Sequence, residues 1–259
     1  RDIIISEARE LVRSGYKEIT LLGQNVNSYG NDREMNFASL LREINNIDGD
    51  FIIRFMTSHP KDCTHELLDT MAQCEKVAKH LHLPVQCGND RVLKAMNRGY
   101  TAEKYLSLLE YARSVMPELS VTSDIIVGFP GETYEEFLDT VKLIEKAQYT
   151  SLYTFIFSPR EGTRAAKMDD PVSREEKGKW FSELCAAQEK IAAVRTSAMV
   201  GREYRVLCES KAKKDGYISG RTQGNIIIEF PADESVIGSF RTVRVTEALI
   251  WMLKGELAD

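Results

Sequence analysis

Residues 121–132 read VTSDIIVGFPGE, an apolar and β-branched run that ends in two glycines, a proline and a carboxylate. A run of this kind, followed at once by a helical pattern, is typical of a strand in a parallel sheet. Four further runs have the same form and end near residues 22, 55, 85 and 157, each before Gly, Pro or small polar residues. This alternation predicts an α/β fold, a partial (βα) TIM-like barrel in which ligands bind at the carboxyl ends of the strands.

The sequence pattern changes near residue 200. Short alternating runs separated by glycines and one proline follow it, which predicts a small antiparallel β-barrel. We therefore expect two domains, the partial βα barrel over residues 1–199 and the small barrel over residues 200–259. The last long helical pattern before the boundary is expected to pack along one stripe of apolar residues: Trp180, Leu184, Ala187, Ile191, Val194 and Ala198.

The start of the chain and its capping signals add two expectations. Asp2 is expected to cap the first helix, and Asn36, Thr64, Thr101, Thr133 and Ser173 are expected to cap later ones. The first helical pattern has no strand before it, so we expect the chain to be a fragment of a longer protein whose first strand precedes residue 1.

Composition excludes several classes of protein. The net charge of −5 over 259 residues argues against a general nucleic-acid coat, and no run is apolar and long enough to cross a bilayer. The five cysteines are scattered singly, as expected of reduced thiols, so we predict a cytoplasmic location without a membrane partner. His80 and His82 could share one face of a strand, but no third ligand is near, so we predict no metal site.

Candidate ligand-binding glycines stand at two predicted strand ends. Gly23 and Gln24 could hydrogen-bond the ammonium and carboxylate groups of an amino-acid-like ligand, although a plain turn explains them equally well. Gly128, Pro130 and Gly131 give a backbone able to lie flat against a planar ring, or a turn that only caps the next helix.

Polar side chains at the same strand ends complete this candidate site. Asp124 lies inside an apolar run and could accept both hydroxyls of a ribose, or form a structural salt bridge. Gln86 follows the third run. Arg98 could reach a ligand carboxylate, or only complement a helix dipole. His59 is expected to be a hydrogen-bonded residue of this rim, and Cys87 has no evident activator.

A second candidate site is basic and lies in the small barrel. Lys and Arg balance Asp and Glu after Gly201, nine against nine, so the domain has no overall attraction to RNA. One segment nevertheless combines cations with an aromatic ring, a composition that suits contact with RNA phosphates and bases, although a solvated hairpin is the alternative. The candidate residues are Lys211, Lys213, Lys214, Tyr217 and Arg221.

Five stretches, at 21–29, 57–60, 82–86, 123–133 and 155–158, together resemble the radical S-adenosylmethionine methylthiotransferases, in particular the MiaB-type enzymes of tRNA. The residues after 200 resemble their RNA-binding TRAM domain. The resemblance implies reductive cleavage of S-adenosylmethionine, two 4Fe-4S clusters in the intact protein, and conversion of isopentenyl-adenosine next to the anticodon to its 2-methylthio derivative.

The resemblance also implies a role for each rim residue toward S-adenosylmethionine. Gly23 and Gln24 would meet the methionyl ammonium, and Arg98 would pair with the carboxylate. Gln86 and Asp124 would hold the ribose, and the loop 128–131 would lie near the adenine. The anticodon stem-loop of tRNA and an electron donor are the expected partners, and we expect a monomer.

Two departures from the family limit this interpretation. The cluster-binding C-x-x-x-C-x-x-C loop and the three cysteines of the family's N-terminal domain are missing here, so we expect no cluster ligands, no catalytic side chain and no activity in this chain alone. Cys87 stands where family members usually carry serine. The alternatives are a sister methylthiotransferase acting on threonylcarbamoyl-adenosine tRNA or on a ribosomal protein aspartate, or an RNA-binding module only.

Overall fold

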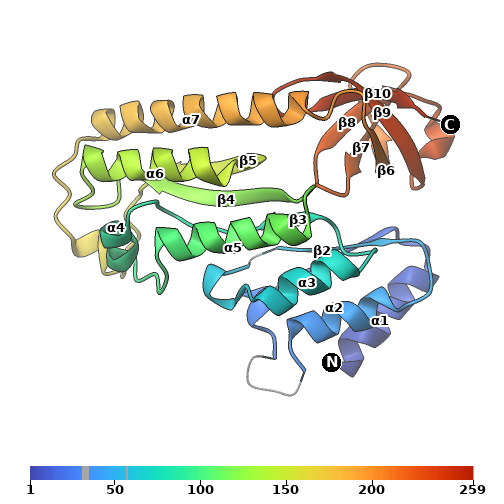
Figure 1. Cartoon of the computed structure of the whole chain (residues 1–259), viewed down its shortest axis with the longest axis horizontal. Coiled ribbons are helices and arrows are strands. Elements are labelled where there is room, and N and C mark those ends of the chain that lie inside the picture. The colour runs from blue at the N-terminus through green and yellow to red at the C-terminus, as the bar shows by residue number, and fades with distance from the viewer. Residues whose placement is uncertain (31–34, 57, 259) are drawn as a thin grey trace.

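The structure, a computed structural model, describes residues 1–30, 35–56 and 58–258 (Figure 1). Thr57, the first residue of the 57–60 stretch, lies outside the described residues. The α-helices of the described residues are α1 (Asp2–Arg13), α2 (Phe37–Asn45), α3 (His65–Gln73), α4 (Asp90–Ala95), α5 (Ala102–Val115), α6 (Tyr134–Ala147) and α7 (Arg174–Ser197). Short 3-10 helices are η1 (Val26–Ser28), η2 (Pro60–Asp62), η3 (Ala165–Lys167) and η4 (Glu234–Val236).

The first domain is the predicted partial βα barrel. Its strands are β1 (Glu18–Leu21), β2 (Ile52–Phe55), β3 (His80–His82), β4 (Ser120–Val127) and β5 (Ser151–Ile156). All their pairings are parallel and follow chain order, and a single bridge between Ile53 and Val77 joins the β1-β2 pair to β3-β4-β5. The fold prediction is therefore confirmed, with β5 at an open edge.

Capping residues in the sequence begin most helices as predicted. The Thr133 hydroxyl accepts from the amide of Glu136, whose carboxylate accepts from the amide of Thr133, a complete capping box. The predicted caps of α2, α3, α5 and α7 accept in the same way. The expectation for α1 is wrong, because Asp2 is the first helical residue and Arg1 precedes it without a side-chain cap.

The predicted apolar stripe of α7 is correct only as far as Ile191. Trp180, Leu184 and Ile191 are buried, but Val194 is 68% exposed. Spacings of four and three repeat every 3.5 residues, whereas an α-helix repeats every 3.6, so such a stripe rotates away from a straight contact line. Further along α7 the buried line moves to Gln188, Ala192 and Thr196.

The second domain is a closed five-stranded barrel. Its strands are β6 (Glu203–Lys211), β7 (Tyr217–Thr222), β8 (Ile227–Pro231), β9 (Phe240–Ala248) and β10 (Leu253–Leu257), in the order β10-β8-β7-β6-β9. The pairings are antiparallel except between β8 and β10, which run parallel and close the barrel. Helix gives way to this barrel between Ser197 and Glu203, around the predicted boundary at residue 200.

The small barrel docks on the amino ends of the first domain's strands. Arg54 of β2, 4% exposed, donates to Glu18 of β1 (2.7 Å) and to the carbonyl groups of Thr222 (2.9 Å) and Gln223 (3.0 Å). Arg221 donates to the same Glu18 carboxylate (2.9 Å). The strand-end rim therefore lies at the opposite end of the sheet from the barrel, and α7 runs between the two (Figure 1).

Candidate ligand-binding site at the strand ends

The loops after β1 and β2 are fastened to each other at the rim. The side-chain amide of Asn27 donates to the carbonyl of His59 (3.1 Å), and its oxygen accepts from the amide of the same residue (2.9 Å). Asn25 donates to the carboxylate of Asp62 (2.6 Å). These bonds fix the turn that carries Gly23 and Gln24, both of which are exposed.

Gln86 adopts a backbone conformation that residues other than glycine rarely take. Its φ is 75°, in the left-handed region, where a side chain costs about 1–3 kcal/mol. Two backbone bonds to β4 hold it there: its amide donates to the carbonyl of Asp124 and its carbonyl accepts from Ile126, both at 2.9 Å. Strain retained in this way is common at ligand-binding positions.

Asp124 lies on the inner face of the sheet and faces His82, with Oδ1 3.5 Å from Nε2. The Thr122 hydroxyl bridges His82 (3.0 Å) and His80 (3.1 Å), so the two histidines do share a face. Burial raises the pKa of Asp124, although His82 and Arg98 act in the opposite direction. Burial also lowers the pKa of both histidines, that of His80 to about 3. Because both histidines are neutral, no charged side chain of β3 or β4 pairs with the Asp124 carboxylate.

Arg98 follows α4 and turns back toward the rim. Asn97 before it is left-handed (φ 60°), and the amide of Arg98 donates to the carbonyl of Leu93 (2.8 Å). Its Nη1 lies 3.5 Å from Nε2 of His59. The buried Nε of Arg98 has no hydrogen-bond partner among the described residues. An unsatisfied buried donor is costly, so this site fits a ligand carboxylate or another acceptor.

A buried carboxylate that was not among the predicted site residues shapes the loop after β4. Glu132, 2% exposed, accepts from the amides of Gly128 (2.7 Å) and Phe129 (3.1 Å). Gly128 and Gly131 both have positive φ, 71° and 75°. Burial raises the pKa of Glu132 to about 7, against the effect of these hydrogen bonds. The role of Glu132 could have been predicted from its position just after Gly128 and Gly131.

Cys87 belongs to the support of this loop. Its thiol donates to Glu132 (3.7 Å) and lies 3.4 Å from the hydroxyl of Thr140. Burial raises the pKa of Cys87 to about 12, so the thiol stays protonated and unreactive at neutral pH.

The predicted rim residues form one group at the ends of β3 and β4 and a second group that is connected to it indirectly. Gln86, Asp124 and Arg98 converge where β3 and β4 end, and the loop 128–131 follows directly. Gly23 and Gln24 connect to this group through Asn27 and His59. No group of three or more His, Cys, Asp or Glu side chains able to hold a metal ion occurs in the described part of the chain.

The predicted RNA-binding residues do not form one surface. Lys211 is paired with Glu234, and the ammonium of Lys214 lies 3.8 Å from the ring centre of Tyr217. Arg221 stands at the other end of β7, where Glu18 and Glu209 hold its guanidinium between the domains. Arg221 is therefore committed to contacts within the molecule.

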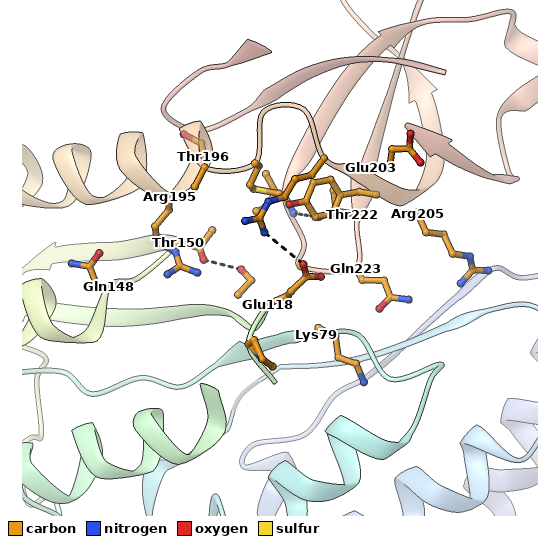
Figure 2. Close-up of a pocket in the computed structure, with 18 of the residues that line it drawn as sticks. Lys79, Glu118, Gln148, Thr150, Arg195, Thr196, Glu203, Arg205, Thr222 and Gln223 are labelled. Carbon is orange, nitrogen blue, oxygen red and sulfur yellow. Dashed lines mark hydrogen bonds and ion pairs between the residues drawn. The ribbon is translucent and has the colours of Figure 1, made fainter. Parts of the chain in front are cut away.

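A cavity of about 510 Å³ lies at the end of the sheet away from the rim (Figure 2). The amino ends of β4 and β5, the end of α7 and the small barrel line it, with Thr150, Arg195 and Gln223 among its residues. Arg202 and Glu118 form a 3.7 Å ion pair across it. It is a gap in the contact between the domains and contains none of the predicted rim residues.

No helix among the described residues is long and apolar enough to span a membrane. An open parallel βα barrel with strained and unsatisfied polar groups at its strand ends is an arrangement in which α/β proteins commonly bind ligands. The sequence pattern of the Radical SAM superfamily matches residues 2–144, and that of the TRAM domain matches residues 197–258. The chain belongs to the Radical SAM superfamily and carries a TRAM domain, which confirms the resemblance seen in the sequence.

Curated relatives agree over almost the whole chain. A tRNA-2-methylthio-N(6)-dimethylallyladenosine synthase of Thermoanaerobacter sp. (strain X514) is 47% identical over 99% of this chain and 55% of its own length. A protein of the same name from Acetivibrio thermocellus is 47% identical over 99% of the chain and 54% of its own length. The chain thus spans about half the length of the curated relatives it matches.

A solved structure supports the fold alone. Coproporphyrinogen III oxidase from Escherichia coli, described as a Radical SAM enzyme, aligns with a TM-score of 0.58 at 16% identity. The alignment covers 86% of this chain and 59% of that protein.

Proposed function

We propose that this chain is the S-adenosylmethionine-binding and RNA-binding part of a tRNA methylthiotransferase that converts isopentenyl-adenosine next to the anticodon to its 2-methylthio derivative. The observation that carries the proposal is the 47% identity, over 99% of the chain, to enzymes named for that product. The rim geometry supports it independently, because polar groups with unfilled hydrogen-bonding capacity converge at the strand ends.

In this proposal each rim residue holds one part of S-adenosylmethionine. Arg98 pairs with the methionyl carboxylate, which would satisfy its buried Nε, and Gly23 and Gln24 meet the ammonium. Asp124 and Gln86 hold the ribose, and the backbone of the loop 128–131, with Pro130, lies against the adenine. When bound, S-adenosylmethionine supplies the reactive species that removes hydrogen from carbon 2 of the target base.

The described residues do not fit the iron-sulfur clusters that this chemistry requires. Cluster ligation needs thiolates grouped around the iron, and the described residues hold no such group. All five cysteines are free, and four of them are buried singly. We therefore assign both 4Fe-4S clusters, and the contact with the electron donor, to parts of the protein outside this chain.

RNA binding by the TRAM domain rests on fewer residues than the sequence indicated. We keep Lys211, Lys213, Lys214 and Tyr217, which lie at the turn between β6 and β7, as contacts with phosphates and bases. Arg221 is left out because carboxylates of both domains already hold it. We place the protein, with its tRNA substrate, in the cytoplasm as a monomer, since free cysteines suit a reducing compartment.

A chimaera tests this proposal. The chain would replace its 47% identical counterpart in the Thermoanaerobacter relative, whose remaining half would supply what this chain lacks. We expect mass spectrometry to show a 2-methylthio product on an anticodon stem-loop that carries isopentenyl-adenosine, and none on a stem-loop that carries threonylcarbamoyl-adenosine. Product on the second RNA only would assign the sister substrate. A folded, cluster-loaded chimaera that modifies neither RNA contradicts the proposal.

A further inference from the structure

The segment 158–168, which follows β5, packs beside the loops at the strand-end rim. At its start, the amide of Phe157 donates to the carbonyl of Val127 at the end of β4 (2.8 Å). Further along, Ala165 and Met168 pack against an apolar cluster that includes Cys87 and Phe129, which follow β3 and β4. The segment is therefore anchored beside the loops that we assign to S-adenosylmethionine.

This anchored segment carries cations that the molecule itself does not neutralise. Arg160, Arg164 and Lys167 are exposed, and Glu161 is the only carboxylate among residues 158–168. Within the part of the chain that the structure describes, none of the three has a carboxylate within 4.0 Å. At the domain contact, by comparison, Arg205 is paired with Asp50 and Arg221 with Glu18.

Exposed aromatic rings lie on the strand that leads into the segment. Tyr153 is 48% and Phe155 is 53% exposed, although both are in a strand of the sheet. Tyr153 pairs in register with Asp124 and contacts the ring of His82 edge to face, with ring centres 5.6 Å apart. Phe155 is two residues further along and shares this face, because side chains alternate along a strand. The rings thus stand on the same face of the sheet as Asp124, on the strand that leads into the segment with the cations.

We propose that Arg160, Arg164 and Lys167 bind the backbone phosphates on either side of the target nucleotide, and that Phe155 stacks on an RNA base at the same edge. The inference rests on the proposed function and adds a second RNA-binding surface to it. Unpaired cations beside exposed rings are the combination that binds unstacked RNA. The TRAM barrel docks at the other end of the strands and cannot supply phosphate contacts at the rim.

The test measures binding of an isopentenyl-adenosine anticodon stem-loop to this chain by fluorescence anisotropy at several salt concentrations. We expect Arg160→Ala, Arg164→Ala and Lys167→Ala together to weaken binding and to lower the slope of log K against log salt by about 2, since each phosphate contact contributes about 0.7–0.9. The matched control replaces three exposed cations on the outer helices, Arg9, Arg13 and Lys104, with alanine and should leave the slope unchanged. Arg160→Lys with Arg164→Lys keeps the charges and should keep the slope.

Phe155→Leu tests the stacking separately. We expect binding to weaken about fivefold or more with an unchanged salt slope, because base stacking releases no counterions. Equal binding and equal slopes for the original chain and the triple variant would overturn this inference and leave the proposed function intact. An original chain that binds no stem-loop RNA would overturn both. Thermal melting of each variant separates loss of binding from loss of folding.

Discussion

Gly128 lies against the side chain of Lys177, so closely that a methyl group on the glycine would come within 2.5 Å of the lysine Cδ. Lys177 is itself fixed: it is buried in α7, and its ammonium binds both carboxylate oxygens of Asp170, at 2.7 and 2.5 Å. The helix therefore holds the loop after β4 in place from outside.

Gly128→Ala should destabilise the protein by about 2–4 kcal/mol, because left-handed strain adds to a clash with a side chain that cannot move freely. Gly131→Ala is the matched control: its φ of 75° imposes the same strain, but an added methyl group meets nothing within 4 Å. It should lose only about 1–2 kcal/mol. Urea unfolding measures the loss of stability in both variants. Equal losses would show that the Lys177 side chain moves away from the added methyl group.

Glu132→Gln should change how stability depends on pH. Burial raises the pKa of Glu132 from 4.5 to about 7, so between these values the folded protein keeps a proton that the unfolded chain releases. The contribution of Glu132 to stability therefore falls as pH rises through this window. We expect the Glu132→Gln variant, compared by urea unfolding, to lack this fall. Glu135→Gln, on the exposed first turn of α6, serves as the control.

His80 affects the same experiment with the opposite sign. Burial lowers the pKa of His80 to about 3, so its contribution to stability is lost as pH falls below about 6.5. Both proteins contain His80, and the difference between them isolates Glu132. An identical pH dependence in the original and in Glu132→Gln would show that Glu132 does not titrate in this range.

Arg54→Ala should cost about 3 kcal/mol of stability, because it removes a buried guanidinium from the Glu18 carboxylate and from the carbonyl groups of Thr222 and Gln223. Arg221 remains on Glu18 and keeps the loss from being larger. Arg244→Ala breaks an exposed ion pair with Glu203 and should leave stability nearly unchanged. Urea unfolding of the two variants distinguishes a buried contact between the domains from a surface pair.

Asp124→Ala should weaken binding of S-adenosylmethionine by about 1.5–3 kcal/mol, the value of a hydrogen bond to a charged group. Calorimetry on the chimaera measures it, with Glu103→Ala on the exposed face of α5 as control. Affinity in Asp124→Ala equal to that of the control would remove Asp124 from the ribose site.

Replacing Lys211, Lys213 and Lys214 with alanine should weaken stem-loop binding and lower its salt slope by less than three phosphate contacts would, roughly 1–2. The reduction is incomplete because Lys211 already pairs with Glu234. Preference for isopentenyl-adenosine over adenosine should survive, since we propose that the base is read at the rim. Anisotropy with both RNAs measures this, and unchanged slopes would place the RNA surface elsewhere.

Much of this architecture could be predicted from local sequence. β-Branched runs ending in glycine, proline or small polar residues placed the carboxyl end of every strand of the first domain to within three residues, because strands of a parallel sheet leave a largely continuous apolar signature. Threonine and serine before helical patterns marked helix starts for an equally local reason, the need to satisfy free amides.

Contacts between distant residues could not be predicted in this way. Arg54 lies inside the apolar run Ile52–Phe55, and its partners Thr222 and Gln223 come from another domain. Arg221 resembled an RNA-binding residue for the same reason, because Glu18 is 203 positions away. The docking of the barrel at the amino ends of the strands follows from these pairs and has no local signature.

Helix α7 packs against the loop 128–131, and its length also sets the distance from that loop to the small barrel. It begins three residues before Lys177, beside the loop 128–131, and its 24 residues end where the barrel begins. At 1.5 Å per residue this is about 36 Å of rigid rod between the rim loops and the start of the barrel. The proposed TRAM contacts between β6 and β7 lie beyond it, at the end of the barrel away from the first domain. An RNA that touches both the rim loops and these contacts must bridge that span without relying on hinge motion. In the proposed function, RNAs would therefore be discriminated by their reach as well as by the base they present.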